Sequence, residues 1–251
     1  MSDPRKIYAI TGSDRTEFLQ GLVTNDVNQM TGRLVYAAML SPQGKYLADF
    51  FLTEDDDRIL LDVAESLAKG FIQRLTMYKL RADVHIEEAP EKLSRGVGNA
   101  PEGALADPRH PDLGWRLYSS SPLPDSDIDW NAIRVAHCIP ETAIELQADE
   151  TYILEAGFER LNGVDFRKGC YVGQEVTARM KHKTELRKGF ATVSIHGVAP
   201  TGTPIESNGK SVGYLFTQAG NRAIAYLRFD RAQGEMLAGN AQVQYDVTSK
   251  N

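Results

Sequence analysis

The most distinctive stretch of this 251-residue chain is FRKGCYVGQEVTARM, residues 166–180. It places Cys170 between two glycines, which have no Cβ and therefore permit a tight turn and the close approach of a ligand. A helix is predicted to begin near Gln174, so the thiol lies within about one turn of a helix N-terminus, whose partial positive charge favours a thiolate. Lys168 adds positive potential. These features together predict a lowered pKa for the Cys170 thiol.

The opposing interpretation is that Cys170 packs as a small apolar side chain, because free cysteine is among the most buried residue types. The residues alone leave these two interpretations equally open. A Cys-His hydrolase is disfavoured, since the nearest histidine in sequence is His182 and nothing indicates that it reaches the thiol. The second cysteine, Cys138, falls on the apolar side of an expected helix and is predicted to be core packing.

Composition limits the class of protein. The hydrophobic fraction of 42% and the charged fraction of 25% are ordinary for a globular protein. No apolar run approaches the roughly 20 residues that span a membrane, and the N-terminus lacks a secretory signal, so we expect a cytoplasmic protein. The net charge of −6 argues against broad nucleic-acid binding. A basic segment, 179–188, is interpreted as either a solvated helix end or an anion site.

The two cysteines stand 32 residues apart and form no CxxC pair, so no structural zinc site and no intrinsic iron–sulfur cluster is predicted. In a reducing compartment both are expected to be free thiols.

Hydrophobic spacing before residue 90 predicts an α+β region. The turn Ser41-Pro-Gln-Gly44 is typical of a β-hairpin. The order strand, strand, helix, strand is compatible with a split β-α-β unit of the ferredoxin-like kind. The expected elements are a helix over 14–23, strands over 34–40, 46–53 and 58–63, a helix over 65–79 and a strand over 82–87.

The middle of the chain gives weaker signals. Residues 89–126 are rich in Pro, Gly, Ser and Asp and are interpreted as loops around edge strands, or as a boundary between two lobes. A helix over 127–137 is expected to stop before Pro140, because the residue before a proline is pushed out of the α region. One helical turn is expected over 155–161.

After Arg187 the pattern becomes β-rich. Short apolar segments at 193–195, 211–216, 223–227 and 243–245 are separated by turn residues, at a spacing typical of a small all-β barrel or sandwich. We therefore predict two domains, 1–186 and 187–251, with a boundary near 186–190.

The octet Lys168-Gly-Cys-Tyr-Val-Gly-Gln-Glu175 matches the K-G-C-[FY]-x-G-Q-E signature of the YgfZ-type folate-binding proteins, which include a mitochondrial iron–sulfur assembly factor. Other segments resemble the family in the same order: FLQGLVTND at 18–26, SPQGKYLAD at 41–49, YKLRAD at 78–83 and Ala178-Arg179. The resemblance covers most of the chain and is weakest over 89–125.

This resemblance implies a relative of the glycine-cleavage T-protein, with a folate-binding α+β region of antiparallel sheets and packed helices followed by a C-terminal β-barrel. It implies a protein that binds tetrahydrofolate or a related folate and supports the assembly or repair of iron–sulfur enzymes. Its implied partners are A-type iron–sulfur carrier proteins and the client enzymes. It is expected to be an accessory factor, with no conventional turnover and no intrinsic metal.

The resemblance also assigns candidate site residues. Cys170 inherits the role of the functional thiol, with Lys168 beside it as the second catalytic candidate and Gly169 as part of its setting. The signature residues that follow are also candidates for contacts with the folate: Gly173, Gln174, Glu175 and Arg179. The segment Leu154-Glu-Ala-Gly157 resembles the T-protein segment whose glutamate holds the pterin ring. A carboxylate suits that task because it accepts two parallel N–H bonds.

The remaining folate contacts each have a structural alternative. Glu155 fits a plain surface helix equally well, and the family often has asparagine where Gly157 stands. Asn25 and Asp26 are candidates for contacts in the folate cavity or for turn chemistry. The aromatic residues that could stack on a pterin include Tyr78, Tyr36, Tyr46 and Phe50, and each fits a core position equally well.

A second class of function stays open. The T-protein reaction needs a carboxylate near the folate amine, and Asp26 and Asp49 are candidates, although neither has the flanking residues of that family. A folate-dependent aminomethyltransferase is therefore the alternative hypothesis, and a purely structural scaffold is a third.

Overall fold

The apolar runs of the N-terminal region form the middle of a five-stranded sheet. The computed structural model describes residues 4–124, 127–183 and 185–246. The strand order is β2-β3-β4-β1-β5 and every pairing is antiparallel. The strands are β1 (Arg5–Thr11), β2 (Val35–Leu40), β3 (Tyr46–Asp55), β4 (Arg58–Ala64) and β5 (His85–Glu88).

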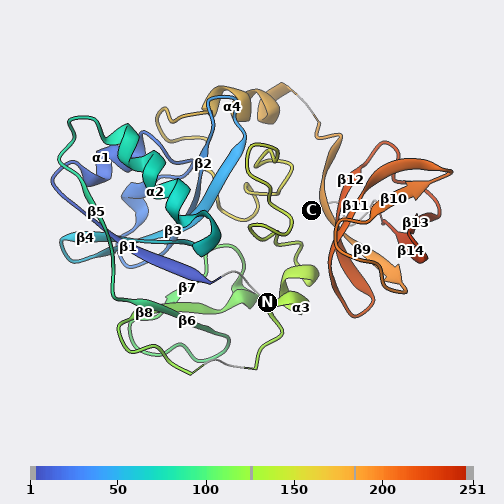
Figure 1. The fold of residues 1–251 in the computed structure, drawn as a ribbon, viewed down its shortest axis with the longest axis horizontal. Coiled ribbons are helices and arrows are strands. Elements are labelled where there is room, and N and C mark those ends of the chain that lie inside the picture. The colour runs from blue at the N-terminus through green and yellow to red at the C-terminus, as the bar shows by residue number, and fades with distance from the viewer. Residues whose placement is uncertain (1–3, 125–126, 184, 247–251) are drawn as a thin grey trace.

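The predicted split β-α-β unit is present. Strands β4 and β5 both pair with β1, which lies between them, and α2 (Glu65–Lys79) connects them across the sheet. Helix α2 has the predicted bounds, while α1 (Arg15–Gln20) is shorter than predicted and ends at Gly21. Both helices lie on one face of the sheet (Figure 1), where Phe71 stacks on Phe50 at a centroid distance of 4.8 Å.

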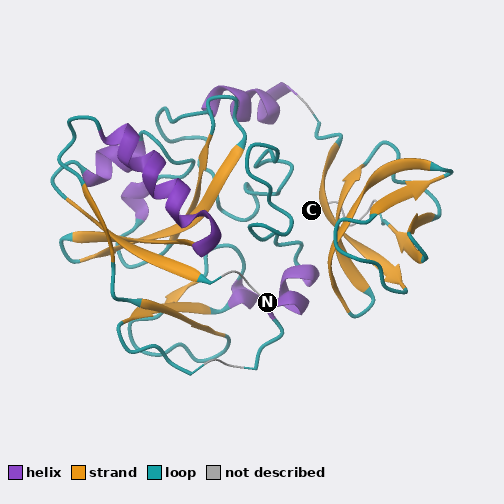
Figure 2. Cartoon of the chain, viewed as in Figure 1, coloured by secondary structure: helices purple, strands orange, loops and turns teal. Residues whose placement is uncertain are grey.

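The opposite face of the sheet is covered by loops. Tyr36, Leu40 and Phe51 pack there against side chains from the segment 139–171. Figure 2 shows this segment as coiled loop between the sheet and the barrel. The helical turn predicted over 155–161 is wrong, because these residues form consecutive turns that end at Asn162, where φ is +54°. With both faces covered, β2, β3 and β4 are almost fully buried, which explains why most of their residues are apolar.

Residues 89–124 are more ordered than the sequence predicted. They contain a three-stranded antiparallel sheet of order β6-β8-β7, from β6 (Lys92–Gly96), β7 (Leu105–Ala106) and β8 (Trp115–Ser119). The described residues also contain the 3-10 helices η1 (Val27–Gln29) and η2 (Pro111–Leu113). Helix α3 (Trp130–Ala136) stops before Pro140, as predicted, and α4 (Gln174–Lys183) begins within the signature octet, where the sequence predicted a helix to start.

The C-terminal strands close into a barrel of order β10-β11-β12-β9-β14-β13. The sequence predicted four of these strands and missed the short β10 and β13. The strands are β9 (Lys188–His196), β10 (Pro204–Ser207), β11 (Lys210–Ala219), β12 (Arg222–Arg228), β13 (Met236–Ala238) and β14 (Ala241–Gln244). The barrel lies to one side of the α+β region (Figure 1). Within the described residues, no helix has the length and apolarity needed to cross a membrane.

Candidate functional site

The loop that carries Cys170 is held by the ammonium of Lys168. Its Nζ donates to the carbonyl oxygens of Gln20 at 2.8 Å, Val23 at 2.6 Å and Asn25 at 2.9 Å, which uses all three of its donors. Gln20 is the last residue of α1, so the charge also satisfies a helix C-terminus. Burial lowers the pKa of Lys168 to about 8, against the opposing effect of nearby carboxylates. Lys168 therefore acts as an anchor for the loop.

Two glycines allow the signature loop to pack closely against the hairpin turn 41–44. Gly173 has φ +83°, and a Cβ there would lie 2.6 Å from the carbonyl oxygen of Ser41. Gly44 has φ +74°, and a Cβ there would lie 2.7 Å from Cβ of Val176 in α4. The segments 41–49 and 168–175, both of which resemble the family, thus pack together although 118 residues lie between them in the sequence.

The two thiols have opposite environments. Cys170 is exposed, and a Cβ added to the preceding Gly169 would meet nothing within 4 Å, so the approach to the thiol is open. Cys138 is buried against Val135 and Ile224, as the sequence predicted. Burial raises the pKa of Cys138 to about 11. Cys170 is the thiol that a partner can reach.

The other signature residues lie just before α4 or on it. Tyr171 is buried, and its ring centroid lies 5.3 Å from Nζ of Lys168. The side-chain amide of Gln174 donates to the carbonyl of Gly169 at 3.5 Å. Glu175 and Arg179 are exposed on α4, where Glu175 in the first turn suits the helix dipole.

A second feature is a cavity of about 300 Å³ between the five-stranded sheet, the three-stranded sheet and α3. We call it the arginine cavity. Two carboxylates line it, Asp49 and Glu141. Its cationic lining residues are Arg5, Lys92, Arg95, Arg109, Arg116 and Arg134.

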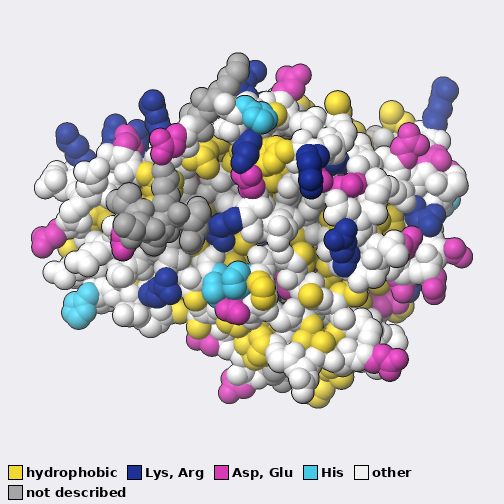
Figure 3. Space-filling view, turned by 180° about the vertical axis from the view of Figure 1, so that it is seen from behind, with side chains coloured by type: hydrophobic (Ala, Val, Ile, Leu, Met, Phe, Trp, Pro, Cys, Tyr) yellow, Lys and Arg dark blue, Asp and Glu magenta, His cyan; other side chains and the backbone are white. Residues whose placement is uncertain are grey.

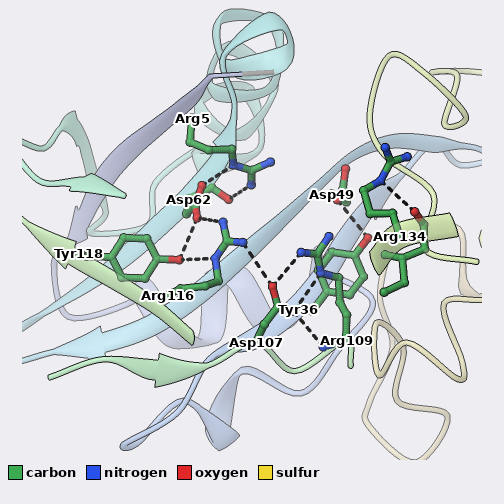
Figure 4. A network of polar contacts seen from close by, with 10 residues as sticks. Arg5, Tyr36, Asp49, Asp62, Asp107, Arg109, Arg116, Tyr118 and Arg134 are labelled. Atoms are coloured by element: carbon green, nitrogen blue, oxygen red, sulfur yellow. Dashed lines mark hydrogen bonds and ion pairs between the residues drawn. The ribbon is translucent and has the colours of Figure 1, made fainter. Parts of the chain in front are cut away.

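Buried ion pairs hold the arginines in place (Figure 4). Asp62 accepts from Arg5 Nε and from a terminal nitrogen of Arg116, each at 2.6 Å, and from the Tyr118 hydroxyl at 2.8 Å. Burial alone would raise the pKa of Asp62, but the two guanidinium groups lower it to about 2. Asp107 likewise bridges Arg109 at 2.7 Å and Arg116 at 3.3 Å. The cavity wall is therefore rigid and permanently charged.

More cationic than anionic side chains line the cavity. Burial, together with the charges of Arg116 and other neighbouring arginines, lowers the pKa of Arg95 to about 10. Phe51 forms an aromatic floor, with the guanidinium of Arg116 at 3.9 Å and that of Arg109 at 4.8 Å from its ring centroid. An anionic ligand would relieve the repulsion among these cations.

Asp49 is the carboxylate at the aromatic end of this cavity. It is 4% exposed and accepts from the hydroxyls of Tyr36 at 3.0 Å, Tyr46 at 2.6 Å and Thr142. Burial and the Asp49 charge raise the pKa of both tyrosines well above the usual range. Of the two aspartates considered for one-carbon chemistry, Asp49 lines the cavity.

Asp26 does not line the arginine cavity. It is the N-cap of η1, where it accepts from the backbone amide of Asn28 at 3.1 Å and from the side-chain amide of Gln20 at 3.0 Å. Partial burial raises its pKa, but the hydrogen bonds from Asn28, Gln29 and Gln20 lower it overall. This is the turn chemistry that the sequence analysis gave as the alternative for Asp26.

The structure does not bring the sequence-predicted folate contacts together. Glu155 lies at the barrel, where it accepts from the hydroxyl of Tyr226 at 2.7 Å. Asn25 lies in a groove of about 680 Å³ beside Phe166, and its amide donates to the carbonyls of Tyr36 and Asn162. Tyr78 lies on α2, where it is partly buried and packs against the core, which is the structural alternative predicted for it. These residues occupy separate places, and none of them lines the arginine cavity.

The sequence did not indicate that the cavity arginines form one site. Arg95, Arg109 and Arg116 fall in the segment interpreted as loops around edge strands, while Arg5 and Arg134 belong to a strand and a helix elsewhere in the chain. One signal was present: Arg116 stands within the otherwise apolar run Trp115–Tyr118, and it is 3% exposed in the structure. A charged residue within a buried strand requires a partner and marks a polar site.

The comparisons with known proteins agree with this fold. Residues 187–249 match the family model described as CAF17, C-terminal beta-barrel domain. The glycine cleavage system aminomethyltransferase T from Bartonella henselae superposes with a TM-score of 0.75 at 13% identity, covering 97% of this chain and 83% of that one. That likeness shows the fold alone: the α+β aminomethyltransferase fold with a C-terminal β-barrel.

Sequence relatives give the family. The chain is 29% identical to the mouse iron-sulfur cluster assembly factor IBA57, mitochondrial, over 96% of this chain and 80% of that protein. It is 28% identical to the human protein of that name, over 93% and 78%. The Mycosarcoma maydis homolog is 30% identical over 76% of this chain, which spans just over half of that relative's length, 56%. The chain belongs to the IBA57/CAF17 (YgfZ-type) family of iron–sulfur cluster assembly factors.

Proposed function

We propose that this protein is a folate-binding accessory factor for the assembly or repair of iron–sulfur enzymes, and that the Cys170 thiol is its reactive group. The observation that carries the proposal is an exposed thiol on a loop fixed by Lys168 and Gly173. A thiol held at a constant position on the surface suits transient contact with a partner's cluster or thiol. The names of the mouse and human relatives support the iron–sulfur part of the proposal.

The arginine cavity is the proposed folate site. Folates combine a flat pterin ring with an acidic glutamyl tail, and guanidinium groups bind carboxylates through two parallel hydrogen bonds. Phe51 and its neighbouring guanidinium groups supply flat faces, and the excess of cations suits the tail. A volume of about 300 Å³ lies at the lower end of the range for small-molecule pockets.

The partners of the proposed activity are A-type iron–sulfur carrier proteins and the client enzymes. Cys170 is separate from the arginine cavity, since neither it nor its neighbours line that cavity. We therefore propose that folate and partner bind different surfaces of the molecule.

The role of Cys170 is tested by complementation of cells that lack this protein. We expect Cys170→Ser to fold as the wild type does, because the side chain is exposed, yet to leave a cluster-dependent enzyme inactive. Cys138→Ala is the matched control, since that thiol is buried and has a pKa of about 11. It should restore activity if the variant accumulates normally. Full rescue by Cys170→Ser would end the assignment of Cys170.

The folate site is tested by calorimetric titration of the purified protein with tetrahydrofolate. Lys92 lines the cavity and is exposed, so its replacement should not disturb the buried ion pairs. We expect Lys92→Ala to weaken binding about tenfold, equivalent to about 1.4 kcal/mol. Lys69→Ala, an exposed lysine on α2, should leave binding unchanged. Equal affinities of the two variants would place the ligand elsewhere.

The second candidate function is an aminomethyltransferase, favoured by the buried Asp49 carboxylate in the cavity wall. This reaction would transfer the methylene carbon of an aminomethyl-lipoyl donor to tetrahydrofolate, with release of ammonia and the dihydrolipoyl thiol. It should be lost in Asp49→Asn and unaffected in Cys170→Ser. Product formation with that pattern would favour this function over the accessory role.

A further inference from the structure

Two histidines and an aspartate meet on the surface, and none of the three lines the arginine cavity. His110 and Asp112 lie at the start of η2, and His137 is the C-cap of α3. In the space-filling view, two adjoining histidine side chains lie beside a carboxylate on the exposed face (Figure 3). We call this set the histidine cluster. The sequence analysis predicted no metal site, and these residues form no recognisable motif because 25 residues separate Asp112 from His137.

The carboxylate of Asp112 lies between two ring nitrogens. Its Oδ2 is 2.6 Å from Nε2 of His137 and 4.0 Å from Nδ1 of His110. The two imidazole rings stack with centroids 3.6 Å apart and planes inclined by 22°. One ligand atom from each of the three side chains lies within 4.8 Å of the other two.

We propose that the histidine cluster binds a divalent transition-metal ion of the zinc class. Two imidazoles and a carboxylate form a ligand set that Zn²⁺ and its neighbours prefer, while Mg²⁺ and Ca²⁺ favour oxygen ligands alone. Three protein ligands would leave a coordination position for water or an outside ligand.

Metal binding requires one imidazole to rotate out of the stack, because ring planes inclined by only 22° at a centroid distance of 3.6 Å do not direct both nitrogen lone pairs at one ion. Ligand atoms at about 2.0–2.1 Å from a tetrahedral Zn²⁺ lie roughly 3.3 Å from each other. The separation of 2.6 Å must widen and the separation of 4.0 Å must shorten, which the Asp112 side chain, 61% exposed, can accommodate. The Nδ1 lone pair of His110 now accepts the Asp112 amide at 3.2 Å, and it would turn to the metal instead.

The backbones that carry the ligands are fixed. Leu113 of η2 is buried in the core beneath the sheet. Arg160 donates to the carbonyls of His137 and Cys138, which holds the end of α3. Its guanidinium charge opposes a cation, and the Asp112 carboxylate offsets that charge. Such fixed supports pre-organise a ligand set.

A bound metal would connect two walls of the arginine cavity. Arg109 and Leu113 line it from the η2 side, and Arg134 lines it from α3. A bridge from Asp112 to His137 would thus tie η2 to α3 without entering the cavity. This inference does not depend on folate binding or on the role of Cys170.

The test is calorimetric titration of the metal-stripped full-length protein with ZnCl₂. We expect one ion per chain, and binding weakened more than tenfold in His137→Ala and in His110→Ala. Asp112→Asn, a nearly isosteric change on an exposed loop, should also weaken binding and keeps the test independent of folding. Substituting Co²⁺ should give visible absorption bands that the His137→Ala variant lacks.

Two controls separate this site from others. His85 lies beside Asp83, with 3.4 Å between Nε2 and Oδ1, so His85→Ala removes an exposed histidine–carboxylate pair and should leave binding unchanged. Cys170→Ser should also retain full binding. The proposal is overturned if the wild type binds no Zn²⁺, if the His110 and His137 variants bind as the wild type does, or if Cys170→Ser alone abolishes binding.

Discussion

At the scale of single residues, the two glycines around Cys170 have different roles. Gly173 has a positive φ and faces the carbonyl of Ser41, so its missing Cβ is required for packing. Gly169 has open space around it and no positive φ. The sequence suggested the same backbone freedom for both, and only the packing separates them. Gly173 shapes the loop, while Gly169 leaves the thiol accessible.

This difference predicts the stabilities of two alanine variants. Gly173→Ala should lower the free energy of unfolding by about 3 kcal/mol, through backbone strain and a contact with Ser41 that has no room for a methyl group. Gly169→Ala should change it by less than about 0.5 kcal/mol. Urea denaturation followed by circular dichroism measures both values. Similar losses in the two variants would contradict the role assigned to Gly173.

At the scale of elements, Asp62 joins the two sheets. It lies on β4, binds Arg5 of β1, and binds Arg116 and Tyr118 of β8. One buried carboxylate thus connects the five-stranded sheet to the three-stranded sheet that the sequence analysis interpreted as loops. Its partners could not be predicted, because ion pairs between residues more than 50 positions apart leave no local pattern.

The depressed pKa of Asp62 predicts a pH dependence of stability. Because the folded-state pKa of about 2 lies below the ordinary value of 3.8, the unfolded state binds more protons between these values. The stabilisation, about 2 kcal/mol, is therefore complete above pH 4 and is lost as the pH falls toward 2. Urea denaturation at pH 5 and at pH 2.5 should show this loss in the wild type.

The matched variants for that experiment are Asp62→Asn and Asp55→Asn. Asp62→Asn should destabilise the protein at pH 5 by about 3–5 kcal/mol, since it leaves buried guanidinium groups without their carboxylate, and should reduce the loss on acidification. Asp55 forms a partly exposed pair with Arg58, so Asp55→Asn should cost less than about 1 kcal/mol. An unchanged acid response in Asp62→Asn would refute the linkage.

At the scale of the whole molecule, buried polar contacts connect the barrel to the rest of the chain. Glu145 is fully buried, pairs with Arg134 of the arginine cavity, and accepts from the amide of Thr217 in β11. Glu155 accepts from Tyr226 of β12 at 2.7 Å, and its backbone carbonyl accepts from the amide of Phe190 in β9. The barrel is thus fixed to the loops that cover the sheet and border the cavity.

The Tyr226–Glu155 contact predicts a stability difference between two tyrosines of the barrel. Burial and the Glu155 carboxylate raise the pKa of Tyr226, which keeps its hydroxyl protonated as a donor. Tyr226→Phe should therefore lower the free energy of unfolding by about 1 kcal/mol. Tyr214→Phe, at an exposed position on β11, should change it by less than about 0.5 kcal/mol. Chemical denaturation of the full chain compares them, and equal values would exclude a role for this contact.

The structural features that depend on the local pattern of residues could be predicted from the sequence alone. The helix over 65–79, the hairpin around residues 41–44 and the β-rich C-terminal region followed from periodicity and turn residues, and the octet 168–175 led to the family. These signals are local because helix, strand and turn formation depend on neighbouring residues.

Which distant residues lie close together depends on the tertiary structure. The arginine cavity combines residues of β1, β6, β8 and α3, and the histidine cluster combines residues of two elements. Glu155 lies at the barrel. The tertiary structure also makes Cys170 the exposed thiol and Cys138 the buried one. The physical reason is that burial and long-range electrostatics depend on chain packing, so residues of similar local sequence acquire different chemistry.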